Sequence, residues 1–256
     1  MLNHPLAARL RQLKLSGMLL SLENRAAQAA EGQLGPTEFL ALLLDDELER
    51  RNQAKFGRAL KESGIEEGKT LAQFDFAAAP QLNRTLILEL ANASFVARAE
   101  NLLLCGPTGT GKSHISHALA FEALKRGHSV WVRPAHRLLA DLNAARADGS
   151  YRRRFTKLCS LDLLAIDDLG LRPLSVQASE DLYEIIQERY ERRSLIVTSN
   201  RAFHEWPEIF SDSLLASAAL DRLTHHSQTI LIQGQSYRQR GRRKEEALIA
   251  PPAETA

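Results

Sequence analysis

The sequence has little cysteine and no long apolar run, and these shortages exclude several classes of protein. Its two cysteines, Cys105 and Cys159, form no C-x-x-C or metal-ligand pattern, so we expect buried free thiols in a reducing cytoplasm. No stretch approaches the roughly 18 consecutive apolar residues of a membrane helix, which predicts no membrane association. Arg9, Arg11 and Lys14 interrupt the N-terminal leucines, so we expect no secretory signal there.

An excess of charge of one sign is also lacking. The formal net charge is +2, so the whole-chain value indicates no particular partner, and only local clusters can do so. Hydrophobic residues make up 44% and charged residues 25% of the chain, the proportions of an ordinary globular protein. A chain of 256 residues can form one large domain, or a medium domain together with a small one.

The most specific motif is a glycine-rich loop that matches G-x-x-x-x-G-K-[ST] at every fixed position. Residues 101–105 before it predict a buried strand, and residues 114–126 after it predict a helix that ends at Gly127. Backbone N–H groups and the helix dipole bind phosphate in such a setting, so a nucleotide site is favoured over a chance match. The candidate ATP-binding residues are Gly106, Pro107, Thr108, Gly109, Thr110, Gly111, Lys112, Ser113 and His114.

Two side chains of this loop are expected to contact the nucleotide or its metal ion. Lys112 can reach the β- and γ-phosphates, and the Ser113 hydroxyl can ligate Mg²⁺.

Polar side chains follow two later apolar runs. Residues 161–168 predict a buried strand that ends in Asp167 and Asp168, and residues 194–200 predict another that ends in Asn200. Ligands bind at the carboxyl ends of strands in open α/β sheets. We therefore expect Asp167 to hold Mg²⁺, Asp168 to polarise the attacking water, and Asn200 to bind the γ-phosphate or orient water. A helix cap or a turn is the alternative for all three.

Basic side chains cluster after the predicted helix 136–147. Tyr151 and Phe155 flank the arginines, and this combination favours contact with the phosphates of DNA. A solvated helix face is the alternative. The candidate DNA-binding residues are Arg146, Arg152, Arg153, Arg154 and Lys157.

The chain before the loop is predicted to be helical and separate. Residues 1–66 carry leucines at helical spacing, with a second helix from Glu38 to about Lys61 that Thr37 caps and whose apolar stripe includes Leu48. The basic face of this helix either is solvated or docks a partner or DNA. Residues 67–244 are expected to form the ATPase domain.

The remaining segments of the chain are predicted as follows. Phe74 and Phe76 in the connector either edge a nucleotide base or pack against the domain. Strands are predicted at 129–133 and 228–232, helices at 81–97, 175–193 and 212–225, a loop at 203–210, and a disordered tail at 245–256.

The succession of motifs resembles AAA+ ATPases of the DnaC/IstB clade, and most of all IstB-like helper ATPases of bacterial insertion sequences. The matching stretches are 69–76, 106–113, 163–170, Val197 to Arg201, Asp221-Arg222-Leu223 and Gly234 to Arg238. The resemblance implies an α/β AAA+ fold, namely a parallel five-stranded sheet flanked by helices, with a small N-terminal all-α domain. It also implies ATP with Mg²⁺ at the subunit interfaces of a homo-oligomer on duplex DNA.

Further roles come from this resemblance alone. Arg222 would be the arginine finger that reaches a neighbour's γ-phosphate, and Arg238 the second sensor arginine of its own subunit. The basic insert around residues 152–154 falls where the clade places a DNA-facing insertion. The helper is expected to mark target DNA and to recruit and stimulate a partner transposase of the IstA type.

One departure from the general AAA+ pattern is Asp168, which stands where that pattern has Glu. Its shorter side chain suggests slow turnover, with ATP acting mainly as an assembly switch. Three functions remain open: a transposition helper, a helicase loader of the DnaC type, and a nucleotide-gated scaffold without useful hydrolysis. A small-molecule kinase is disfavoured because it leaves Arg222 and Arg238 without a role.

Overall fold

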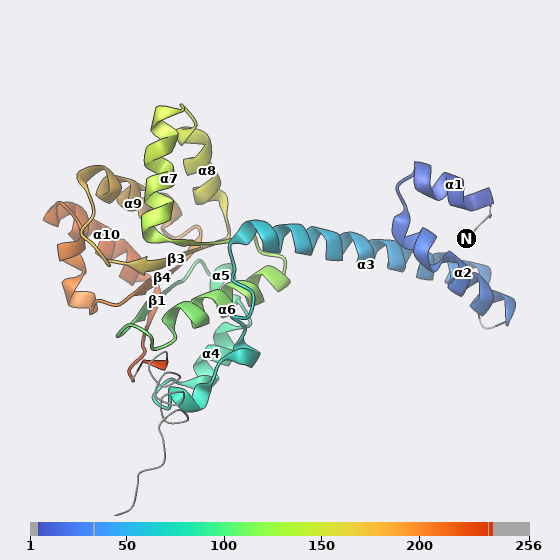
Figure 1. The fold of residues 1–256 in the computed structure, drawn as a ribbon, viewed down its shortest axis with the longest axis horizontal. Helices are drawn as coiled ribbons and strands as arrows, with labels where there is room; N and C mark the ends of the chain where they lie inside the picture. Colours follow the sequence, from blue (N-terminus) through green and yellow to red (C-terminus); the bar gives the residue numbers. More distant parts are fainter. Residues whose placement is uncertain (1–4, 33, 235, 238–256) are drawn as a thin grey trace, which may run out of the picture. The chain divides into compact units, whose positions relative to one another are not determined.

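The computed structural model describes residues 5–32, 34–234, 236 and 237 (Figure 1). The chain divides into two compact units, 1–59 and 60–256, which meet within α3 (Pro36–Ser63) and are described separately below. Arg238 and the tail 245–256 lie outside the described residues.

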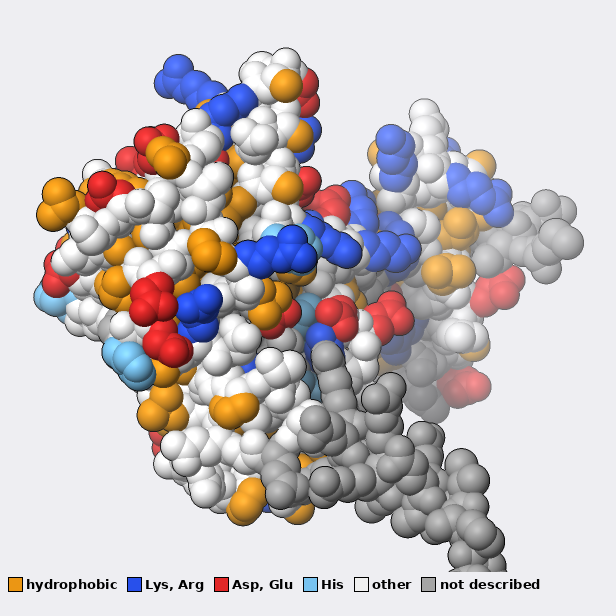
Figure 2. Space-filling model, turned by 60° about the vertical axis from the view of Figure 1, so that its left-hand side comes forward, with side chains coloured by type: hydrophobic (Ala, Val, Ile, Leu, Met, Phe, Trp, Pro, Cys, Tyr) orange, Lys and Arg blue, Asp and Glu red, His pale blue; other side chains and the backbone are white. Residues whose placement is uncertain are grey.

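Basic and acidic side chains are both present on the face shown in Figure 2. Within the described part of the chain, no helix is both long and apolar enough to cross a membrane.

The first unit is a set of three helices around a small apolar core. It consists of α1 (Pro5–Gln12), α2 (Ser16–Ala30) and the first part of α3. Met18, Leu22 and Leu43 are buried at its centre. The backbones of α2 and α3 touch at Gly17, where a Cβ atom would lie 2.7 Å from the Glu47 Cα atom, so only glycine fits there.

The sequence-based account of α3 needs two corrections. The helix begins at Pro36 rather than after Thr37, because the fixed φ angle of proline suits the first helical position. Leu48 is 58% exposed, whereas its neighbour Glu47 is 4% exposed. The glycine contact brings Glu47, and not the predicted apolar residue, to the face of α3 that meets α2.

Glu47 is an ionised carboxylate inside the helical unit. It accepts hydrogen bonds from the Gly17 N–H at 2.5 Å, from Arg51 Nε at 2.6 Å and from the Arg50 guanidinium at 3.2 Å. Burial disfavours the charge, but the hydrogen bonds from Arg51, Arg50 and the backbone outweigh it and lower the pKa of Glu47 to about 2. The carboxylate therefore joins α2 to α3.

The second unit is built on a parallel five-stranded sheet, which confirms the predicted fold class. Its strands are β1 (Asn101–Cys105), β2 (Val130–Pro134), β3 (Leu163–Leu169), β4 (Ser194–Ser199) and β5 (Ser227–Leu231). Their order is β2-β3-β4-β1-β5, and every pair is parallel. This order places the carboxyl ends of β1, β4 and β3 side by side, where ligands bind in open α/β sheets.

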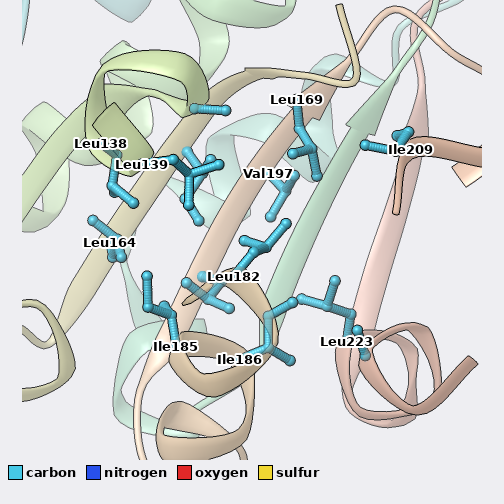
Figure 3. Close-up of a cluster of buried hydrophobic side chains, with 14 of the residues drawn as sticks. Leu138, Leu139, Leu164, Leu169, Leu182, Ile185, Ile186, Val197, Ile209 and Leu223 are labelled. Atoms are coloured by element: carbon cyan, nitrogen blue, oxygen red, sulfur yellow. The ribbon is translucent and has the colours of Figure 1, made fainter. Parts of the chain in front are cut away.

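Helices cover both faces of this sheet. In Figure 1, α6 (Lys112–Lys125) lies on one side of the strands, and α7 (Ala135–Ala147) and α9 (Val176–Arg189) lie on the other. Alternate strand residues pack against α7, α9 and α10 (Ser213–His225) in one large core cluster. Figure 3 shows this contact, with Val197 of β4 beside Leu182 of α9, and Leu164 of β3 near Ile185 of α9.

Three predicted elements differ in the structure. The helix expected at 81–97 is two helices, α4 (Arg84–Leu90) and α5 (Ser94–Ala97), because Ala93 between them has a φ of +55°. The loop expected at 203–210 is a 3₁₀ helix, Phe203–Ile209, which encloses the fully buried Trp206. Strand β3 does not end at the two acids but continues to Leu169.

Candidate nucleotide site

The glycine-rich loop joins β1 to α6 at the carboxyl edge of the sheet. Gly106 has a φ of +149°, and a Cβ atom there would lie 2.1 Å from the Ile232 carbonyl oxygen. Gly111 precedes α6 with a φ of +101°, and its Cβ atom would lie 2.7 Å from the ring of Phe74. Conformation and crowding together exclude side chains at these two positions, which leaves backbone N–H groups to line the loop.

Lys112, the lysine of the loop, is 5% exposed. Its Nζ donates a hydrogen bond to the Pro107 carbonyl oxygen at 2.7 Å. Burial lowers the pKa of Lys112, and the nearby carboxylates Asp168 and Asp167 oppose that shift. The ammonium group is thus held inside its own loop between a carbonyl and two acids, and a phosphate oxygen could replace the carbonyl as its acceptor.

Asp167 and Asp168 lie beside this lysine on β3. Asp167 is 7% exposed and accepts a 2.5 Å hydrogen bond from the Thr198 hydroxyl. The backbone N–H of Asp168 donates to the same hydroxyl oxygen at 2.9 Å. Asp168 has a φ of +56°, at the point where the register between β3 and β4 shifts. The irregular backbone here interrupts the usual pattern of a strand, in which consecutive side chains point to opposite faces of the sheet.

Thr198 is a residue that sequence reasoning missed. It is fully buried on β4, and its hydroxyl bonds both to the Asp167 carboxylate and to the Asp168 backbone. A hydroxyl side chain within a buried strand was the available signal, because a buried polar group needs a partner.

Asn200 follows β4 at the same edge of the sheet. Its side-chain oxygen is buried and accepts no hydrogen bond from the described residues. A buried acceptor of this kind is normally satisfied by water or by a ligand. The next residue, Arg201, is occupied elsewhere: its Nε donates to the Gly170 carbonyl at 2.8 Å, and its guanidinium pairs with Glu208 at 3.4 Å.

A cavity of about 510 Å³ is lined by the glycine-rich loop and by connector residues between 69 and 79. The connector contributes Lys69, Phe74 and Ala78 to the lining, and Tyr237 also belongs to it. The Tyr237 backbone N–H donates to the Gly109 carbonyl at 2.9 Å, so the end of the described chain is held against the loop. A cavity of this size, lined by Lys112, Asp168 and the ring of Phe74, suits a nucleotide.

The two connector phenylalanines have different positions. Phe74 lines the cavity and packs edge-on against His114, whose Nε2 lies 2.8 Å from the Thr70 carbonyl oxygen. Phe76 packs edge-on against Phe74, with ring centroids 4.8 Å apart, and is not part of the lining. Packing therefore accounts for Phe76, whereas Phe74 is placed both to pack and to meet a bound ligand.

The donor set fits a nucleotide with a hard divalent cation. The glycines of the loop leave space that side chains would otherwise fill, and the ammonium group of Lys112 supplies a positive charge beside that space. Hard oxygen ligands of the kind that Mg²⁺ prefers are available from Ser113 and Asp167. The oxygen of Asn200 adds a buried acceptor without a donor in the described chain.

The structure does not bring Arg222 to this cavity. Arg222 lies on α10, where its guanidinium donates to the Ala218 carbonyl at 2.8 Å and sits 5.6 Å from the centre of the Tyr183 ring. Arg238, the other arginine expected at the site, lies outside the described residues.

The five basic candidates for DNA contact separate into two groups. Arg152, Arg153 and Arg154 are exposed in the first turn of α8 (Tyr151–Ser160), and Arg154 bonds to Ser150 and Asp148. Helices α7 and α8 pack side by side (Figure 1). The three arginines thus project from one end of a helical pair.

The other two basic candidates make contacts inside the unit. Arg146 forms a two-pronged ion pair with the buried Asp181, at 2.8 and 2.5 Å, and stacks over Tyr151 at 4.1 Å. Lys157 lies 4.2 Å above the centre of the Trp131 ring. Arg146 therefore has a structural contact that the sequence did not reveal, because its partner lies 35 residues away.

Comparison with known proteins identifies relatives of the chain. Residues 8–245 match the family described as "IstB-like ATP binding protein". A Pseudomonas aeruginosa protein, named for ATP binding in insertion sequence IS21, is 38% identical over 241 residues, which cover 94% of this chain and 91% of that protein. A Mycobacterium tuberculosis protein, also named for ATP binding in an insertion sequence, is 39% identical over 91% of this chain and 93% of its own length.

Solved structures share the fold. The crystal structure of DnaI has a TM-score of 0.54 at 23% identity and covers 64% of this chain and 90% of its own. The replication initiator DnaA, solved with AMPPCP and single-stranded DNA, has a TM-score of 0.55 at 20% identity and covers 75% of this chain and 58% of its own. The fold is that of AAA+ ATPases, and the chain belongs to the family of IstB-like ATP-binding proteins of insertion sequences.

Proposed function

We propose that this protein is an ATP-dependent helper of DNA transposition, which assembles on duplex target DNA and recruits and stimulates a partner transposase. The family supplies the connection to ATP and to insertion sequences. The observation that carries the ATPase assignment is the convergence of Lys112, Asp167 and Asp168 beside a cavity that the glycine-rich loop lines.

Each residue of the site has a defined part in this proposal. The backbone N–H groups of residues 106–113 bind the phosphates, and Lys112 exchanges the Pro107 carbonyl for a phosphate oxygen. The Ser113 hydroxyl and Asp167 hold Mg²⁺, which supplies positive charge against the β- and γ-phosphates. Asp168 polarises the attacking water, and Asn200 orients that water or binds the γ-phosphate.

Assembly is the second part of the proposal. Arg222 lies outside the lining of the cavity in its own chain, which suits a finger that completes the pocket of a neighbouring subunit. Arg238 would act as the sensor arginine within its own subunit. ATP would then bind at the interfaces of a homo-oligomer, so that nucleotide and assembly depend on each other.

The N-terminal helical domain, residues 1–66, would dock partners or other copies of the chain. Leu40, Leu44 and Leu48 are each about half exposed and recur every four residues, so they form an apolar stripe along one face of α3. An exposed stripe of this kind on so small a unit favours a protein partner over solvent. Residues 67–244 would form the ATPase domain.

Duplex DNA would be bound through the end of the α7–α8 pair. The exposed guanidinium groups of Arg152, Arg153 and Arg154 carry this assignment, since arginines neutralise backbone phosphates without reading sequence. Arg146 and Lys157 would support that end of the pair through their contacts with Asp181 and Trp131.

Slow hydrolysis follows from Asp168. Its side chain is one methylene shorter than that of a glutamate, and the left-handed backbone at this residue limits where the carboxylate can lie. We therefore propose that ATP acts mainly as an assembly switch. Steady-state hydrolysis with DNA present should be slow, and turnover as fast as that of a processive motor would contradict this proposal.

A helicase loader of the DnaC type is the second candidate. The likeness to DnaI shows a shared fold and does not separate the two functions. A gel-shift comparison does so, because a loader should prefer single-stranded DNA and a transposition helper should prefer duplex.

The Lys112→Ala variant tests the nucleotide site itself. We expect it to lose ATP-dependent assembly on duplex DNA, measured by sedimentation, and to bind a fluorescent ATP analogue weakly. Lys125→Ala, at the far end of α6, is the matched control and should behave as the wild type. Unchanged nucleotide affinity in Lys112→Ala would remove the loop from the proposal.

A further inference from the structure

Two histidines and a glutamate meet at the edge of the sheet opposite the nucleotide site. His225 ends α10 and His226 directly precedes β5, while Glu191 lies in the turn between α9 and β4. These segments lead into the amino ends of parallel strands, whereas the glycine-rich loop follows the carboxyl end of β1. The three residues have no part in the proposed ATPase chemistry.

The spacing of their ligand atoms is that of a metal site. Glu191 Oε1 lies 3.3 Å from His226 Nε2 and 3.8 Å from His225 Nδ1, and one ligand atom from each residue lies within 4.8 Å of the other two. A tetrahedral ion with bonds of about 2.1 Å holds its ligand atoms about 3.4 Å apart. Only small side-chain movements separate the present arrangement from coordination.

We propose that Glu191, His225 and His226 bind a divalent transition metal of the Zn²⁺ type, with water as the fourth ligand. Two imidazoles and one carboxylate form a ligand set of known catalytic and surface zinc sites, whereas Mg²⁺ and Ca²⁺ prefer oxygen ligands throughout. Each of the three side chains is about half exposed, so an ion and its water have access.

The surrounding groups hold the ligands in place. The His226 carbonyl accepts a hydrogen bond from the Asn101 N–H at 2.8 Å, and the Asn101 side chain donates to the Leu223 carbonyl at 3.2 Å. Both histidines therefore sit on backbone that is fixed to β1. The Tyr190 hydroxyl lies 2.7 Å from His225 Nδ1, so a metal at that nitrogen would displace it, and the Glu191 carboxylate is close enough to accept its hydrogen bond instead.

A metal ion bound at this site would join two elements of the fold. The ion would connect the turn after α9 to the end of α10, three residues beyond Arg222. Because α10 carries Arg222, metal binding would restrict the motion of the helix that presents the proposed finger. The metal site itself does not depend on the ATPase proposal.

Cobalt titration of the full chain, prepared without a polyhistidine tag and stripped with chelator, tests this site. We expect one Co²⁺ per chain, with the intense visible absorption of a four-coordinate ion, and displacement by Zn²⁺ but not by excess Mg²⁺. His225→Ala and His226→Ala should each weaken binding by more than about 10-fold. Absent binding, or only the faint spectrum of six-coordinate Co²⁺, would overturn the proposal.

Two controls separate this site from others. His204→Ala removes an exposed histidine from a different element, and Lys112→Ala impairs the nucleotide site at the opposite edge of the sheet. Both variants should bind Co²⁺ as the wild type does. Equal loss of binding in His204→Ala and His225→Ala would refute the proposal, and circular dichroism would establish that each variant is folded.

Discussion

Replacement of Thr198 by valine tests how the two acids of the site are held. Valine has nearly the same shape as threonine, so the fully buried position stays filled while the hydroxyl is lost. Asp167 then loses the donor at 2.5 Å, and the Asp168 N–H loses its acceptor at 2.9 Å. The hydroxyl bonds to both residues, so the variant should affect stability and the proposed catalysis together.

The loss of folding stability in Thr198→Val can be estimated from these two hydrogen bonds. A hydrogen bond to a charged group contributes about 1.5–3 kcal/mol, and an unsatisfied polar group adds to the loss, so we expect a destabilisation of about 2–4 kcal/mol. For a unit of this size the melting temperature should fall by roughly 5–15 °C. ATP hydrolysis should also fall, with a higher Mg²⁺ requirement, because Asp167 is no longer oriented.

Differential scanning calorimetry and steady-state ATPase assays at several Mg²⁺ concentrations measure these effects. Thr198→Ser is the matched control: it keeps the hydroxyl and loses one buried methyl group, which costs about 1 kcal/mol. We expect serine to retain the low Mg²⁺ requirement and valine to lose it. If the valine variant melts and turns over ATP like the wild type, the hydrogen-bond bridge has no role in positioning the acids.

Three further predictions concern other parts of the chain. Arg222→Ala should leave ATP binding intact and remove hydrolysis, as measured by nucleotide titration and phosphate release. Combined replacement of Arg152, Arg153 and Arg154 by alanine should weaken duplex binding and flatten its dependence on salt, since fewer counterions are released. Glu47→Gln should reduce the pH dependence of stability in urea unfolding. The folded-state pKa of Glu47, about 2, lies below the ordinary 4.5, so its contribution is present above about pH 5 and is lost as the pH falls toward 2.

Controls and contrary outcomes differ for the three. Hydrolysis that survives in Arg222→Ala would place the finger elsewhere. Arg192→Ala is the control for the triple variant, because it removes an exposed arginine from the turn between α9 and β4 and should not alter DNA binding. If the triple variant shows an unaltered dependence of DNA binding on salt, the three arginines form a solvated helix face and not a DNA contact. An acid-unfolding profile of Glu47→Gln identical to that of the wild type would refute the stabilising role of the carboxylate.

Several features could be predicted from the sequence because they depend on neighbours along the chain. The glycine-rich loop is defined by residue identity at fixed spacing, and the apolar runs beside it are short and bounded, so strands β1 to β5 were all predicted to within two residues. The polar residues that end apolar runs also indicated the edge of the sheet where the glycine-rich loop lies, since parallel strands bring their carboxyl ends together.

What only the tertiary structure decided depends on residues that are distant in sequence. Thr198 meets the two acids from another strand, Arg146 meets Asp181 across 35 residues, and Gly17 turns Glu47 rather than Leu48 toward the core. Local pattern predicts which residues form a helix or a strand, because helix hydrogen bonds close within a few residues and the side chains of a strand follow a period of two along the chain. It does not fix which side chains become neighbours, because that depends on how whole elements pack, and the pairing of buried polar groups is settled only there.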